Sequence, residues 1–289
     1  MMKYIAPFLV LFSLSFYANA QNSTEIFLFD VNEENPDATL SNPLNISDNI
    51  GYDNQPSFTD NGKAILFAST RNGQTDILWY DIDSGSKKWL SDTHGGEYSP
   101  VLMPDGKHIS AVRLDPDGLQ LLYQYSIKEK TSEVLVPELK IGYYAWISES
   151  TIIAFVLGEP AALQEINVIN GELNNVYSNP GRSIHHIPKT KMYSFIDKSD
   201  STNWKIMRAV PGNTKWTEEI TSTLSGSEDM VWLNMHTILM GKDDKLYAFD
   251  IRANSNEWQL FADLSEYGLS GITRLATSGN KIAVVVNGK

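Results

Sequence analysis

Four side chains of the type that binds metals stand out in the sequence: His94, Glu97, His185 and Asp229. Imidazole nitrogens and carboxylate oxygens of this kind suit a divalent ion such as calcium or manganese. No fixed spacing joins them into a ligand motif, and the adjacent His185 and His186 would point to opposite faces of an extended segment. We therefore expect no cofactor, and a divalent metal such as calcium stays open as the alternative.

The sequence contains no recognisable motif for a catalytic nucleophile. The chain has no cysteine, and no serine lies in a G-x-S-x-G elbow. We assign no catalytic residue and expect a binding or interaction module rather than an enzyme. The alternative is a metal-dependent enzyme, a polysaccharide lyase or a lactonase-like hydrolase, with His94, Glu97, His185 and Asp229 as ligands.

The elements that position these residues follow a repeat of 41 to 45 residues. An apolar or aromatic residue before a turn recurs six times, at Phe58, Leu102, Trp146, Ile187, Trp232 and Leu275. The turns Asn61-Gly62 and Asp105-Gly106 supply residues that tolerate a positive φ, as a tight hairpin requires. A period of this length indicates an array of supersecondary units.

Each unit contains the signals of four short strands. Stretches such as "AILFAS", "TIIAFV" and "KIAVVV" are rich in β-branched residues, are too short for helices and are bounded by turn formers. Four strands in about 40 to 45 residues are typical of one blade of a β-propeller. The sequence predicts an all-β, six-bladed propeller, with Trp146 and Trp232 packed between blades.

The two ends of the chain complete each other. "TEIFLFDV" matches the third strand of a blade and "ATLSNPLNIS" a fourth, whereas "KIAVVVNGK" matches a second strand. The N-terminal strands should therefore close the last blade, which removes an exposed sheet edge. We expect one propeller domain over residues 21–289.

Two segments, "QPSFTDNGKAILFASTRNGQTDILWYD" and "YSPVLMPDGKHISAV", resemble the repeat of TolB-like propellers, also called WD-like propeller repeats. The matching residues are Pro56, Phe58, Gly62, Lys63, Arg71, Gly73, Asp76 and Ile77 in one repeat and Pro100, Pro104, Asp105, Gly106 and Lys107 in the next. The resemblance covers about residues 54–112 and implies the fold, which hosts many functions. The α/β domain that precedes the propeller in TolB is not expected here.

A propeller presents its ligand site at the channel mouth, on the loops that enter the innermost strands. By the repeat, the candidate binding residues are Asp53, Asn54, His94, Glu97, Tyr98, Tyr143, Tyr144, Arg182, His185, Glu228 and Asp229. The three tyrosines could stack against a carbohydrate or a peptide, because tyrosine gives contact area at low entropic cost.

The N-terminus carries an export signal. Lys3 precedes an apolar run over residues 5–16, and Ala18-Asn19-Ala20 forms a small-residue cleavage site. The run is shorter than the about 20 residues of a membrane-spanning helix. Residues 1–20 are therefore predicted to be a signal peptide, and the mature protein to be periplasmic or secreted without membrane insertion.

The charge of the chain narrows the class of partner. A formal net charge of −12 gives no electrostatic reason to bind nucleic acid or anionic lipid. The partner expected of an exported module is an envelope or extracellular protein, a peptide or a glycan.

The predicted cleavage after Ala20 can be tested on the N-terminus of the exported protein. The protein recovered from the periplasm or the medium should begin at Gln21, as intact-mass spectrometry and N-terminal sequencing will show. An Ala20→Arg variant should retain its first residues, because the small-residue site is lost. A recovered wild-type protein that begins at Met1 would contradict the signal assignment.

Overall fold

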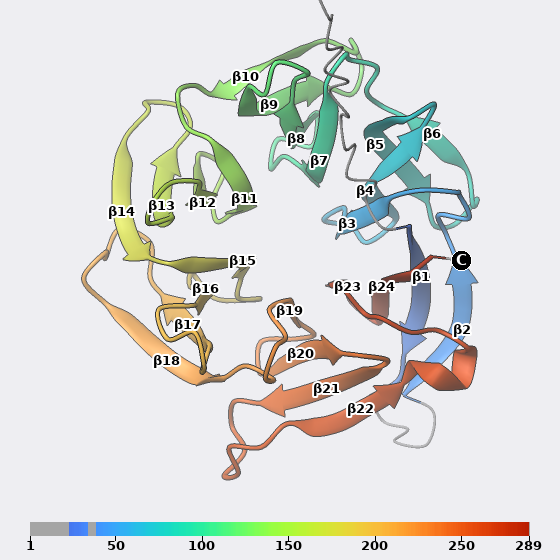
Figure 1. Ribbon diagram of the computed structural model, residues 1–289, viewed down its shortest axis with the longest axis vertical. Helices are drawn as coiled ribbons and strands as arrows, with labels where there is room; N and C mark the ends of the chain where they lie inside the picture. The colour runs from blue at the N-terminus through green and yellow to red at the C-terminus, as the bar shows by residue number, and fades with distance from the viewer. Residues whose placement is uncertain (1–22, 34–38, 289) are drawn as a thin grey trace, which may run out of the picture.

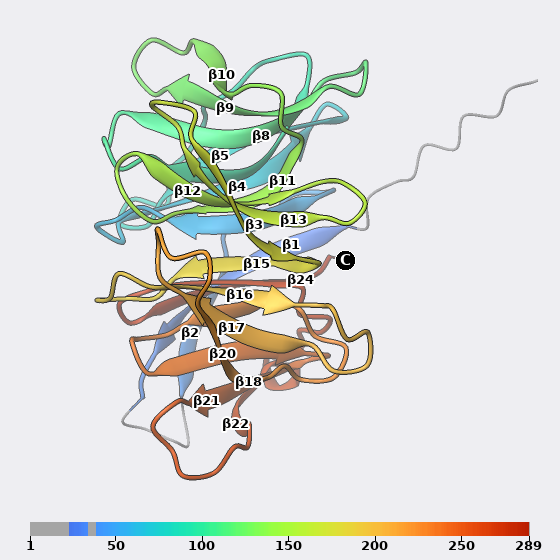
Figure 2. The same cartoon turned by 90° about the vertical axis from the view of Figure 1, so that its left-hand side faces the viewer.

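Residues 23–33 and 39–288, the part of the chain that the computed structural model describes, form 24 β-strands and one short 3₁₀ helix, η1 (Leu264–Tyr267). The strands make six four-stranded sheets that surround a central channel as the blades of a propeller (Figure 1). Seen from the side, the sheets follow one another face to face around the ring (Figure 2). The predicted all-β, six-bladed fold is confirmed, whereas the predicted signal peptide lies outside the described residues.

Five blades take their strands in chain order from the channel outward (Figure 1). The first contains β3 (Asp53–Phe58), β4 (Ala64–Arg71), β5 (Gln74–Asp81) and β6 (Lys87–Trp89), and the second β7 (Gly96–Leu102), β8 (His108–Leu114), β9 (Gln120–Ser126) and β10 (Ser132–Val136). The third contains β11 (Ile141–Trp146), β12 (Thr151–Val156), β13 (Ala162–Asn167) and β14 (Leu173–Ser178). The fourth contains β15 (Pro180–His186), β16 (Tyr193–Asp197), β17 (Lys205–Ala209) and β18 (Thr217–Ser222), and the fifth β19 (Met230–Trp232), β20 (Thr237–Lys242), β21 (Lys245–Asp250) and β22 (Gln259–Asp263).

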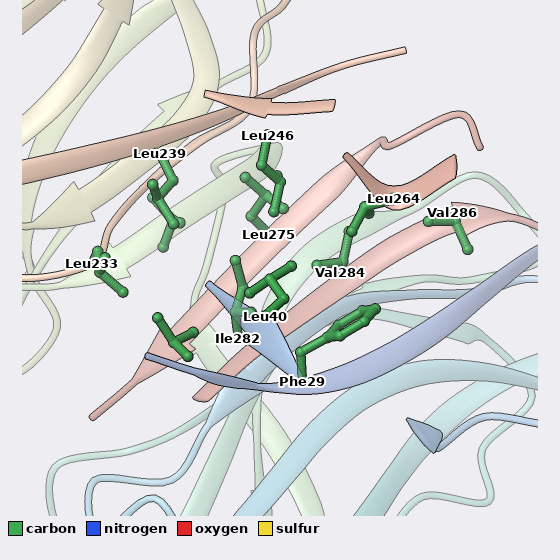
Figure 3. Packing of buried hydrophobic residues seen from close by; sticks show 12 residues of the cluster. Phe29, Leu40, Leu233, Leu239, Leu246, Leu264, Leu275, Ile282, Val284 and Val286 are labelled. Atoms are coloured by element: carbon green, nitrogen blue, oxygen red, sulfur yellow. The ribbon is translucent and has the colours of Figure 1, made fainter. Parts of the chain in front are cut away.

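The sixth blade is built from both ends of the chain, as predicted. It contains, from the channel outward, β23 (Arg274–Ser278), β24 (Lys281–Asn287), β1 (Thr24–Val31) and β2 (Leu40–Asn45). β1 pairs antiparallel with β24 along its length, from Thr24 opposite Asn287 to Asp30 opposite Lys281. Phe29 and Leu40 pack against Ile282 and Val284 inside this blade and join leucines from the fifth (Figure 3).

Strand pairing defines which residues of the six repeats are equivalent. Phe58, Leu102, Trp146 and Trp232 pair with equivalent isoleucines of the second strands, as the predicted repeat requires. In the other two blades the equivalent residues are His186 and Thr277, which pair with Tyr193 and Ile282. The sequence had placed Ile187 and Leu275 there. These repeats lack the Asp-Gly type of turn that marks the register in the first two.

Two tryptophans join neighbouring blades, as predicted. Trp146 Nε1 donates to Ser110 Oγ on β8, and Trp232 Nε1 donates to Ser194 Oγ on β16, each at 2.9 Å. Both serine residues are fully buried. A buried indole N–H without an acceptor would cost about 1–3 kcal/mol, so each hydroxyl helps to hold a seam between two blades.

Deleting residues 21–47 should prevent folding. The deletion removes Ile26, Leu28, Phe29, Leu40 and Ile46, all buried, at about 2 kcal/mol each. Their sum is comparable with the whole stability of a typical domain, about 5–15 kcal/mol, and β24 would become an exposed edge. Thermal melting followed by circular dichroism tests this. A truncated chain that melts cooperatively at the original temperature would show that closure is not required.

Candidate functional site

Six side chains that can form hydrogen bonds lie at corresponding places in the amino-acid sequence of the six repeats. Each lies three residues before the paired position defined above, or four in β15, where the pairing with β16 is irregular between Pro180 and Ile184. We call this set the channel ring; its members are Gln55, Ser99, Tyr143, Arg182, Asp229 and Arg274. All six line one cavity.

The cavity has a volume of about 600 Å³ and runs from the channel ring to the turns that follow the inner strands. Asp60 and Glu149, both exposed, lie at its turn end. The volume falls within the about 300–1,000 Å³ of small-ligand pockets. The cavity thus follows the second half of the inner strands, whereas the sequence analysis had placed the site on the loops that enter them.

An ion cluster and an aromatic ring lie at the opposite end of the cavity. Asp229 accepts hydrogen bonds from Arg182 on β15 and from Arg274 on β23. The guanidinium carbon of Arg274 also lies 5.3 Å from the centroid of the Tyr143 ring. Tyr143 belongs to the third blade and Arg274 to the sixth, on opposite sides of the ring (Figure 1), so this contact crosses the channel. It makes the channel ring the floor of the cavity.

Glu228 sets the position of Arg182. Its Oε1 accepts the Arg182 backbone N–H at 2.6 Å, and its Oε2 accepts from Lys198 Nζ at 3.2 Å. Gly181 makes the first contact possible, because a Cβ at this position would lie 2.8 Å from Glu228 Oε1. A second hollow of about 480 Å³ lies between the last three blades, and its lining includes Arg182, Glu228 and Asp229.

His185 is a neutral group on the cavity wall. Burial lowers its pKa to about 4, against the opposing effect of Asp229. Its Nε2 lies 3.0 Å from Ser183 Oγ, which also accepts the Met230 N–H at 3.1 Å. At neutral pH, therefore, the positive charge at the cavity floor comes from the two arginines and not from His185.

Bulges turn the first two inner strands toward the cavity. The pairing of β3 shifts between Asn54 and Ser57, and that of β7 between Tyr98 and Val101. Gln55 and Ser99 lie at these shifts with positive φ values of 57° and 51°. The Ser99 N–H donates to Gln55 Oε1 at 2.9 Å. Bulges of this kind re-aim side chains beside functional sites.

Five of the eleven predicted site residues line the cavity: Tyr143, Tyr144, Arg182, His185 and Asp229. Tyr144 is almost fully buried, and its hydroxyl donates within the seam between the second and third blades, to Ser110 Oγ or the Ser99 carbonyl. Glu228 lies in the adjacent hollow. Tyr98 packs edge-on against Tyr52, with the ring centroids 6.2 Å apart, and His94 lies exposed on the turn before β7.

Asp53, Asn54 and Glu97 differ from the prediction, because the structure buries all three away from the cavity. Glu97 accepts hydrogen bonds from Ser91 and Thr93, at 2.8 and 2.5 Å. The equivalent residue of the first blade, Asp53, accepts from Ser69 Oγ at 2.5 Å. The bulges that follow both carboxyl groups shift the alternation of side chains, so Gln55 and Ser99 face the channel in their place.

The metal site held open as an alternative has no support from the geometry. Within the ranges 23–33 and 39–288, no three histidine, aspartate or glutamate side chains lie close enough to hold an ion. His185 and Asp229 share the cavity wall, whereas Glu97 is buried among Ser91, Thr93 and Tyr125.

Among residues 23–33 and 39–288, the structure contains no helix long and apolar enough to cross a membrane.

Sequence reasoning missed Arg274, Gln55 and Ser99. Each could have been found by carrying the repeat position of Tyr143 and Asp229 into the other blades. In the last repeat the sequence analysis named no candidate site residue; η1 and a loop that contains Gly268 and Gly271 precede β23 there. In the first two, the bulges hid the inward direction of Gln55 and Ser99.

No protein-family model matches the chain, and no curated protein matches it. Solved structures do match. TolB from Acinetobacter baumannii superposes with a TM-score of 0.59 at 14% identity, over 81% of this chain and 65% of TolB. A protein assigned as TolB from Agrobacterium tumefaciens gives 0.70 at 12% identity, over 93% of this chain and 99% of the other. The fold is that of the TolB-like propellers.

Other propellers of different activity share this fold. An oligogalacturonate lyase in complex with manganese superposes with a TM-score of 0.56 at 12% identity, over 85% of this chain and 79% of the lyase. Identities this low establish the fold alone, which lyases share with TolB. The function of this propeller has to be argued from its own cavity.

The buried carboxyl groups predict how stability depends on pH. Burial raises the pKa of Glu97 from 4.5 to about 7 and that of Asp53 from 3.8 to about 6. The folded state therefore favours the protonated forms. Their contribution to stability is complete below about pH 4 and is lost as the pH rises through about 7.

Glu97→Gln should remove most of this dependence. We expect the wild-type melting temperature to fall between pH 5 and pH 8, and the variant to be more stable than wild type at pH 8 by up to about 3 kcal/mol. The exposed Glu129→Gln serves as the control and should change nothing. A variant that melts below wild type at pH 8 would contradict the assignment.

Proposed function

We propose that this protein is an exported binding module that holds a segment of a partner protein in its central cavity. The cavity carries the proposal, since it is a hollow lined by the channel ring and by aromatic and apolar side chains. Tyr143 and Trp146 offer rigid contact area, and Arg182 and Arg274 offer charged donors. Aromatic residues and arginine dominate the binding energy of protein interfaces.

Several observations favour binding over catalysis. Of the carboxyl groups on the cavity wall, Asp229 is bound by both arginines, and Asp60 and Glu149 are exposed at the turn end. His185 has a pKa of about 4, too low for efficient proton transfer near neutral pH. Asp53 and Glu97, the two described carboxyl groups whose pKa is raised, are buried within the blades, away from the cavity. The predicted export of the chain would bring this cavity to envelope or extracellular proteins.

Site-specific photo-crosslinking in the native cell tests the proposal. A benzophenone amino acid at His186, which is exposed at the cavity edge, should give a covalent adduct with a partner polypeptide, identified by mass spectrometry. The same group at Ile169, exposed in the turn between β13 and β14, should not. No adduct at His186, or the same adducts at both positions, would overturn the proposed function.

A further inference from the structure

The channel ring offers more hydrogen-bond donors than acceptors. Among the residues that the structure describes, Arg274 Nε and Nη2 and Arg182 Nη1 have no protein partner. The same holds for Gln55 Nε2 and the Tyr143 hydroxyl. Both oxygens of Asp229 already accept from arginines, and Gln55 Oε1 accepts the Ser99 N–H.

A ligand that satisfies this ring must bring acceptors, and the two arginines favour an anionic one. The cluster of Arg182, Asp229 and Arg274 carries a formal charge of one positive unit, although the whole chain is acidic. The side chains of Arg274 and Asp229 are only 15% and 16% exposed, so water screens the cluster little. Guanidinium groups match the planar geometry of a carboxylate.

We propose that the channel ring captures the C-terminal carboxylate of a peptide segment that enters the cavity from the turn end. This inference rests on the proposed function and names the chemical group that the cavity recognises. The carboxylate binds the free donors of Arg274 and Arg182. Gln55, on the neighbouring strand β3, and Tyr143, across the channel, also donate to it. The terminal residue therefore lies at the floor, where Arg274 contacts Tyr143.

The order of charges along the cavity favours a peptide terminus over an acidic oligosaccharide. The floor is positive, whereas the turn end carries the exposed carboxylates of Asp60 and Glu149. An oligosaccharide with an anion on every sugar would meet repulsion at the turn end. A peptide with one terminal carboxylate does not, and a basic residue upstream of its terminus would pair with Asp60 or Glu149.

The dimensions and walls also fit an extended peptide. Asp60 follows Gln55 by five residues, which corresponds to at most about 16 Å, the length of a fully extended chain. About five extended peptide residues therefore cover the distance from floor to turns. Pro56, Pro100 and Val101 line the walls in between and offer apolar contact to the peptide side chains.

Pools of random pentapeptides with an N-terminal lysine, one as free acids and one as C-terminal amides, provide the test. We expect the acid pool to bind the full-length mature protein at least about tenfold more tightly by calorimetry, because hydrogen bonds to a charged group are worth about 1.5–3 kcal/mol. The difference should shrink as salt concentration rises.

Variants of the channel ring separate recognition from folding. Arg274→Gln should bring the acid-to-amide affinity ratio close to one. Asp229→Asn should raise affinity for the acid pool, because the internal carboxylate that competes for both arginines is gone. Loss of fold cannot produce this gain. Arg208→Gln, which removes a half-buried arginine of β17 that does not line the cavity, is the matched control and should leave the ratio unchanged.

Three other results would each overturn one or both proposals. Equal binding of acid and amide pools, with the His186 crosslink retained, would overturn carboxylate capture and leave the proposed function standing. Tighter binding of an acidic oligosaccharide than of the acid pool would assign the ring to a glycan and overturn the peptide. Binding of neither pool, together with no crosslink at His186, would overturn both proposals.

Discussion

The pairing of β1 with β24 joins the two ends of the chain in one sheet, and the whole ring depends on it. Each blade covers only its neighbours, so an open array would leave two apolar sheet faces in water. The seven residue pairs from Thr24–Asn287 to Asp30–Lys281 prevent this, and Phe29 fills the space beneath them. No disulfide assists, since the chain lacks cysteine.

Closure has a direct consequence for the cavity. Once the six inner strands are fixed side by side, equivalent repeat positions come to the same level of the channel. Side chains that lie about 45 residues apart, such as Asp229 and Arg274, then form an ion pair. A single set of positions can in this way vary in residue type without disturbing the blades, which is how one fold supports different ligands.

Two sets of charged side chains differ in their surroundings. Asp53 and Glu97 lie within the blades, where burial raises their pKa and makes the fold sensitive to pH. Arg182, Asp229 and Arg274 lie on the cavity floor, where partial burial strengthens the electrostatic interactions of their charges but leaves the side chains accessible to a ligand. Only the second set is available to a ligand, and the proposed binding function rests on it.

The sequence by itself determined the architecture. Its period, its turns and its two complementary ends predict six blades and their closure, because strand signals are local and recur. It also marked Tyr143, Arg182, His185 and Asp229 near the channel. Only the tertiary structure decided which side chains face the cavity, because the bulges at Gln55 and Ser99 and the irregular pairing of β15 shift the alternation without a local signal. Arg274 joined the site through ring closure, which brings it across the channel to Tyr143.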